Sequence, residues 1–379
     1  MEFEQDRMPR AESLTGLRWF AAFFVFVHHI ANLVAIRSIT AWSWLGVTGV
    51  TFFFVLSGFV LTWSWFPCDR AKRFYWRRFA RIYPLHFITT LLALPVFYGS
   101  QQAFQKPWNW TQLALSLVLL HAWATPTQIY FAGNPASWSL SDEAFFYSLF
   151  PTAIRRLMAL SIRRALLFAA GAVALMWLVL IAVVVLHPST GVAVFTLRSP
   201  MYRVLEFFLG IALAVAVRQG WRPRLSFWAA LAMLLVALAV LVIWARTPHL
   251  QHLIKSTSMM NQVTAPFYGL LIATAACRDI AGRRSFLRWG PLVRLGQWSY
   301  AFYLTHATVI YAVLLWHGGR ITGSLPTKAG VIAATLGISI AVAWALYGLV
   351  EHPTERKLRS MLPPLSEVPE TANPRLGWQ

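Results

Sequence analysis

The sequence predicts an all-α polytopic membrane protein, a bundle of about ten transmembrane helices. The chain has 379 residues, of which 58% are hydrophobic and only 12% are charged. Soluble proteins are about 45–50% apolar and about 25% charged. Apolar runs of helical length recur from Leu17 to His352, and a bilayer core about 30 Å thick needs roughly 20 helical residues to cross it.

Eleven segments are candidates for membrane spans. They cover approximately 17–36, 44–66, 82–99, 111–124, 143–158, 165–186, 202–217, 225–244, 262–277, 295–316 and 328–350. If all eleven crossed, the basic loop 155–164 would face outward, against the tendency of Lys and Arg to remain on the cytoplasmic side. We therefore interpret the short run 111–124 as a re-entrant or surface segment of a long outer connection, with an imperfect eleventh helix as the alternative. Ten spans place 25 of the 33 Lys and Arg residues inside, with both termini cytoplasmic.

The distribution of charge also limits the partners. A net charge of +20 would suit a nucleic-acid-binding protein, but here Lys and Arg cluster in short loops between apolar runs, which is typical of membrane orientation. We expect a single integral-membrane domain over 1–379, with a core of about 12–357 and a short disordered tail of about 360–379. Residues 1–16 show no cleavage site, so the first span is expected to be retained in the inner membrane. The lipid bilayer is an expected partner and nucleic acid is not, and no feature indicates an oligomeric state.

The first span, LTGLRWFAAFFVFVHHIANL, keeps an arginine and two histidines among apolar residues. With Arg18 at the inner end of a helix, His29 lies about 16 Å further along, near the middle of the bilayer. Eleven steps of about 100° return nearly to the same face, whereas His28 points about 80° away. Arg18 can meet anionic phosphates, and a neutral His29 can accept a proton from a hydroxyl. We expect Arg18 and His29 to line one shared cavity.

A structural reading of these residues remains open. Arginines that reach back to the membrane surface are common, and the two histidines can serve helix packing. Ionisable groups at mid-membrane are nevertheless functional candidates. Of the pair, His28 is the one we expect to be structural.

The basic segment before the third span is a candidate phosphate site. Arg78 and Arg81 are three residues apart on one helical face, directly before the sequence IYP. This spacing suits a nucleotide-type phosphate group. The alternative is a cluster that orients the protein or meets anionic lipid.

The end of the outer connection, NPASWSLSDEAFFYSLFP, is expected to begin a helix at a capping box formed by Ser139 and Asp142. Glu143, Trp138 and Tyr147 are expected at an outer mouth, where they could position a hydroxylated acceptor.

Three other spans contain polar residues. Ser57 lies among small residues that favour close helix packing, and it is a candidate substrate contact but lacks the surroundings of an acyl-enzyme serine. Arg203 and Glu206, three residues apart, are expected to form an internal ion pair.

A second histidine is predicted at mid-membrane depth. His306 lies about eleven residues into a span that begins at the inner face, and Tyr303 lies one turn away. No metal-ligand spacing is present, so no metal is expected.

Seven pieces of the sequence, in this order, resemble the acyltransferase-3 family of membrane-bound O-acyltransferases over about 12–357. The pieces are Arg18 with His29, FFFVLSGF at 52–59, Arg78-x-x-Arg81, WSLSDEAFFYSLFP at 138–151, RVLEFFLG at 203–210, SYAFYLTH at 299–306 and EHPTER at 351–356. The amino-acid sequence of these pieces is most similar to that of the macrolide-tailoring branch. Where many members have an acidic residue after GV in the second span, this chain has Thr51.

The resemblance implies transfer of an acyl group, usually acetyl, from acetyl-CoA or another acyl-CoA to a hydroxyl of a sugar, a polysaccharide unit or a natural product. It makes Arg18 and His29 the essential pair, and associates Arg78 and Arg81 with the donor. We expect His29 to act as base, with His306 or Tyr303 supporting the oxyanion or the acceptor. An acyl-histidine intermediate stays open. The rival hypotheses are a proton-coupled secondary transporter and an exporter of the acylated product.

Overall fold

The computed structural model describes residues 8–9, 11–36, 42–67, 69–247 and 259–362. The predicted tail lies outside these residues from position 363 onward. All regular elements in the described part of the chain are helical, and the only β-type pairings there are isolated bridges.

Ten long helices correspond to the ten predicted spans. In chain order they are α2 (Glu12–Leu33), α4 (Thr48–Trp63), α5 (Ala71–Phe97), α8 (Trp138–Met158), α9 (Ile162–Leu186), α11 (Pro200–Arg218), α12 (Phe227–Arg246), α14 (Met259–Ile280), α15 (Gly290–His317) and α16 (Leu325–Leu346). Within the described residues, eight stretches are long and apolar enough to cross a membrane, and α8 and α14 are not among them. The described part of the chain is therefore all-helical with eight candidate membrane helices, and a count of ten crossings stays a prediction.

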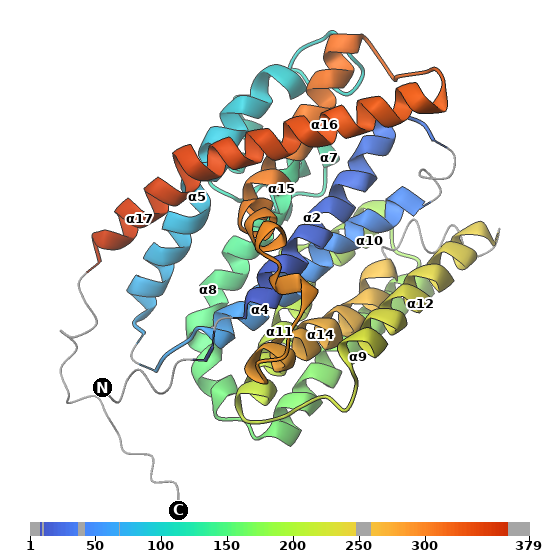
Figure 1. Cartoon of the computed structure of the whole chain (residues 1–379). Coiled ribbons are helices and arrows are strands. Elements are labelled where there is room, and N and C mark those ends of the chain that lie inside the picture. Colours follow the sequence, from blue (N-terminus) through green and yellow to red (C-terminus); the bar gives the residue numbers. More distant parts are fainter. Residues whose placement is uncertain (1–7, 10, 37–41, 68, 248–258, 363–379) are drawn as a thin grey trace, which may run out of the picture.

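The central and peripheral helices differ in burial. About 78% of the apolar window in the α4 stretch is buried inside the protein, compared with 22% in α9 and 17% in the stretch that begins with α16. In Figure 1, α5 and α16 lie on one side of α2 and α4, and α9 and α12 lie on the other. The apolar outer faces of these peripheral helices suit contact with lipid.

Glycines allow the central helices α4 and α11 to pack closely. A Cβ atom added at Gly58 would collide with the carbonyl oxygen of Phe207, and one added at Gly210 would collide with that of Val55. The two backbones therefore approach each other through reciprocal glycine contacts, as small residues permit in membrane proteins. This crossing fixes α4 and α11 beside the polar residues described below.

The long connection between α5 and α8 contains only short helices. They are α6 (Trp110–Leu117), η2 (His121–Trp123), α7 (Thr127–Tyr130) and η3 (Pro135–Ser137). At 1.5 Å per residue α6 is about 12 Å long, too short to cross a bilayer. Run 111–124 therefore does not form an eleventh long helix.

Two helix starts differ from the prediction. α5 begins at Ala71 rather than near residue 82 and continues through Pro84, so the basic segment is helical. α8 begins at Trp138, and its N-cap Ser137 makes no side-chain capping bond. The prediction of a capping box formed by Ser139 and Asp142 is wrong, because the Ser139 hydroxyl instead forms a hydrogen bond with the Tyr303 hydroxyl.

Candidate active site

Two neighbouring cavities penetrate the bundle. The larger, about 860 Å³, is lined by residues of α2, α4, the α5–α8 connection, α8, α10 (Thr190–Arg198), α11, α14 and α15. The smaller, about 150 Å³, lies between α2, α4, α5, α8 and α15. Val50 and Tyr303 line both cavities, so the two spaces meet at these side chains.

Three histidines face the larger cavity. The ring centroids of His29 and His306 are 5.2 Å apart, and those of His28 and His29 are 4.8 Å apart. His28 Nδ1 lies 3.1 Å from the Ser43 carbonyl oxygen, whereas His29 Nδ1 is buried without a hydrogen-bond partner. His29 is thus the less constrained of the two adjacent imidazoles. Among the described residues no group of three His, Cys, Asp or Glu side chains could hold a metal ion.

The surroundings of His306 fix which of its nitrogens carries hydrogen. Its Nδ1 lies 3.1 Å from the Phe302 carbonyl oxygen, which can only accept, so Nδ1 donates. The other ring nitrogen, Nε2, is buried and unpartnered. A neutral His306 therefore presents an acceptor at Nε2.

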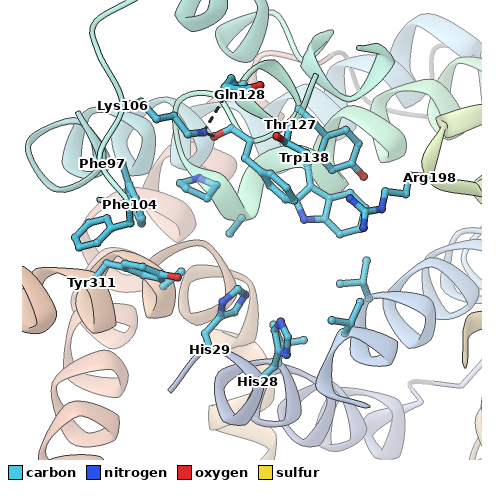
Figure 2. Close-up of a pocket in the computed structure, with 18 of the residues that line it drawn as sticks. His28, His29, Phe97, Phe104, Lys106, Thr127, Gln128, Trp138, Arg198 and Tyr311 are labelled. Carbon is cyan, nitrogen blue, oxygen red and sulfur yellow. Dashed lines mark hydrogen bonds between the residues drawn. The ribbon is translucent and has the colours of Figure 1, made fainter. Parts of the chain in front are cut away.

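Aromatic rings form much of the wall opposite the histidines. Figure 2 shows His28 and His29 on one side of the space, facing Trp138, with Phe97, Phe104 and Tyr311 at one flank. Tyr130 packs against Trp138 with ring centroids 5.4 Å apart. Burial raises the pKa of Tyr130 well above its usual value, so its hydroxyl stays protonated. Such a wall offers flat apolar faces with few polar groups.

The smaller cavity brings together all three arginines predicted to bind the donor. Arg18 comes from α2, and Arg78 and Arg81 come from α5. Arg18 makes no hydrogen bond or ion pair with any described residue. Arg78 lies 5.8 Å from the centroid of Phe74 and has an unpartnered, buried Nε.

Arg81 differs from the other two because it is already paired. Its Nη1 lies 2.6 Å from Glu351 and 2.9 Å from Glu355. Glu351 ends a π-helical turn (Tyr347–Glu351) that joins α16 to α17 (His352–Ser360). Of these three arginines, Arg18 and Arg78 thus have guanidinium groups available for a phosphate.

Glu143, Tyr147 and Ser57 form a hydrogen-bonded chain in the smaller cavity. The Tyr147 hydroxyl donates to Glu143 Oε2 at 2.7 Å and lies 3.3 Å from Ser57 Oγ. The three residues expected together at an outer mouth do not line one space, because Trp138 lines the larger cavity and Glu143 and Tyr147 line the smaller one. Each residue along α8 adds 1.5 Å, which moves the later positions away from Trp138.

The first-span residues also occupy different cavities. Arg18 lines the smaller one and His29 the larger one, so the expectation of a single shared cavity is replaced by two spaces that share Tyr303 and Val50. The Tyr303 hydroxyl lies 2.9 Å from Ser139 Oγ at this junction.

A buried polar cluster borders the larger cavity. Arg203 pairs with Glu206 at 2.9 Å, as their spacing predicted. Thr51 donates to Asn261 Oδ1 at 3.0 Å and lies 3.4 Å from both members of the ion pair. Sequence reasoning missed Asn261, because a single asparagine near a helix start carries no local signal for a partner on another helix.

A family model described as an acyltransferase domain matches residues 12–348. The chain belongs to the acyltransferase-3 family. It is 35% identical to acyltransferase MdmB of Streptomyces mycarofaciens, over 97% of both chains. It is 25% identical to O-acetyltransferase OatA of Staphylococcus aureus, over 91% of this chain but only 57% of that protein. No solved structure matches significantly.

Family membership settles the class of activity. The chain is an O-acyltransferase, and its apolar helices make it an integral membrane protein. The donor, the acceptor and the roles of individual residues are inferred below from the two cavities.

Proposed function

We propose that the protein transfers acetyl or another short acyl group from acyl-CoA to a hydroxyl of a sugar, a polysaccharide unit or a natural product such as a macrolide. The observation that carries this proposal is the meeting of an arginine-lined cavity and a histidine-lined cavity at Tyr303. The name of OatA describes an O-acetyltransferase, which favours acetyl as the group transferred.

The smaller cavity is the proposed donor site. Arg18 and Arg78 offer unpaired guanidinium groups, which bind phosphate oxygens through charge-assisted hydrogen bonds. The small volume suits the narrow pantetheine arm, with the nucleotide remaining at the mouth. Arg81 can bind the donor only if its ion pairs with Glu351 and Glu355 break.

The larger cavity is the proposed acceptor site. His29 removes the proton of the acceptor hydroxyl as the oxygen attacks the thioester carbonyl carbon, and the carbon–sulfur bond then breaks to release the coenzyme thiol. General-base help of this kind contributes about 10²–10⁴-fold. His306 or Tyr303 supports the oxyanion or the acceptor, and Ser57, Tyr147 and Glu143 line the path of the acyl arm. No metal takes part in this proposal.

The proposal includes the placement of the chain in the cell. The arginine cavity and both termini face the cytoplasm, where acyl-CoA is present, and the protein lies in the inner membrane as one domain. The histidine cavity then opens toward the other side. The clustering of Lys and Arg in the loops near the termini supports this orientation.

Thiol release distinguishes this function from transport. The full chain in lipid nanodiscs with acetyl-CoA should release coenzyme thiol, with water attacking the thioester in place of the acceptor hydroxyl, and an equal amount of Arg18→Gln protein should release little. A proton-coupled transporter or an exporter would instead move substrate into proteoliposomes without thiol release, and that result would overturn the proposal.

A further inference from the structure

The larger cavity is cationic. Lys106, Arg198 and Arg203 line it, whereas no Asp or Glu does so among the described residues. Arg203 is already paired with Glu206. Lys106 and Arg198 therefore remain as the charges that face its interior.

The described connections at this end of the bundle contribute no carboxylate, and Asp142 and Glu206 lie instead on the helices α8 and α11. Three connections between the long helices at this end lie wholly within the described residues: 98–137, 187–199 and 318–324. Together they contain three Lys and Arg residues and no Asp or Glu. An anion at this end consequently meets attraction and no carboxylate repulsion from these connections.

Arg198 is the cation best suited to bind a ligand. It is the last residue of α10 (Thr190–Arg198), is partly buried, and makes no hydrogen bond or ion pair with any described residue. Lys106 differs, because its Nζ donates to the carbonyl oxygen of Phe131 at 2.9 Å and burial lowers its pKa. A guanidinium also presents two parallel N–H groups that match a carboxylate or a phosphate.

The position of Arg198 relative to the histidines defines a binding pose. Figure 2 shows Arg198 and Lys106 on opposite sides of Trp138, with His28 and His29 across the space. A sugar ring on the face of Trp138 would lie between Arg198 and the proposed base. Aromatic faces commonly provide such an apolar surface.

We propose that this cavity selects a hydroxylated acceptor that carries a carboxylate or phosphate group, which Arg198 holds while the reacting hydroxyl faces His29. This inference rests on the proposed function and narrows its acceptor to anionic compounds. An acidic sugar and a phosphate-linked sugar share this chemistry.

Three matched probes test the selection. They are 4-nitrophenyl β-D-glucoside, 4-nitrophenyl β-D-glucuronide and 4-nitrophenyl β-D-glucoside 6-phosphate. Isothermal titration of the full chain in phosphatidylcholine nanodiscs, without acyl-CoA, measures each dissociation constant. At least one anionic probe should bind about tenfold or more tightly than the neutral glucoside, as a hydrogen bond to a charged group provides. The dissociation constants of the glucuronide and the glucoside 6-phosphate show whether a carboxylate or a phosphate binds more tightly.

Two variants locate the effect. Arg198→Gln should reduce the preference to about threefold or less. Arg320→Gln removes the same charge from an exposed residue at the same end that does not line the cavity, and it should keep the preference. Equal binding of neutral and anionic probes, no binding of any probe, or an equal loss in both variants would overturn the inference.

Failure here is separable from failure of the proposed function. Thiol release from acetyl-CoA that depends on His29 needs no anionic probe, because water can accept the acetyl group. If that release persists while the anionic preference is absent, only the acceptor class is wrong.

Discussion

The imidazole of His29 lies beside that of His306, with ring centroids 5.2 Å apart, although the two residues come from α2 and α15. Each ring has a buried nitrogen without a hydrogen-bond partner, Nδ1 in His29 and Nε2 in His306. Both nitrogens are therefore open to a ligand that enters the larger cavity. A neutral imidazole is the form that can accept a proton from a hydroxyl.

Replacing Arg78 should weaken donor binding more than turnover. Its guanidinium lines the small cavity without an ion-pair partner, so Arg78→Gln should raise the KM for acetyl-CoA by about tenfold or more. Initial rates of thiol release at several acetyl-CoA concentrations measure this change. Arg70→Gln, at the exposed N-cap of α5, is the matched control and should leave KM unchanged. If both variants raise the KM, the cause is a general loss of positive charge and not the loss of a contact between Arg78 and the donor.

Tyr303 and Ser139 allow a role in chemistry to be separated from a role in packing. If the Tyr303 hydroxyl stabilises the oxyanion, Tyr303→Phe should lower kcat by about 10²–10³-fold, the effect of losing one oxyanion donor. Ser139→Ala removes only the partner of that hydroxyl and should cost less than about tenfold. Equal losses in the two variants would mean that Tyr303 acts only by holding the junction.

The crossing of α4 and α11 should be intolerant of larger side chains. Gly210→Val should destabilise the protein by about 1–3 kcal/mol, because the new methyl groups meet the backbone of α4. Gly171→Ala in α9 is the control, since a Cβ there has no atom within 4 Å. Thermal unfolding in nanodiscs compares them, and an unchanged Gly210→Val midpoint would contradict the described packing.

His121 should make the free energy of unfolding depend on pH. It is fully buried, and burial together with nearby His86 lowers its pKa to about 3. A lowered histidine pKa gives stability that is present above the unfolded value of about 6.5 and is lost as pH falls below it. The unfolding temperature should therefore fall from pH 6.5 to pH 5, and His121→Gln should reduce this slope. Identical slopes in wild type and variant would rule out His121 as the cause.

Helix periodicity predicted much of the bundle and part of the site. The rise and turn of an α-helix were enough to place Arg18 and His29 far apart along one span, and the i,i+3 rule was enough to pair Arg203 with Glu206. The mid-span position of His306 likewise matched that of His29.

Features that depend on contacts between distant helices were not predictable in this way. Ser139 has the spacing of a capping box, but Tyr303 from α15 offers it a closer partner. The placement of Glu143 depended on which neighbouring helices its side chain faces in the folded bundle. The division of the site into two cavities depends on Tyr303 and Val50, whose shared position no local pattern encodes.

The most direct test compares two adjacent histidines. Thiol release from acetyl-CoA by full-length protein in nanodiscs should fall by about 10²–10⁴-fold in His29→Ala, the range of general-base catalysis, and by less than about tenfold in His28→Ala. Full activity in a folded His29→Ala protein, or equal losses in both variants, would contradict the assignment of His29 as the base.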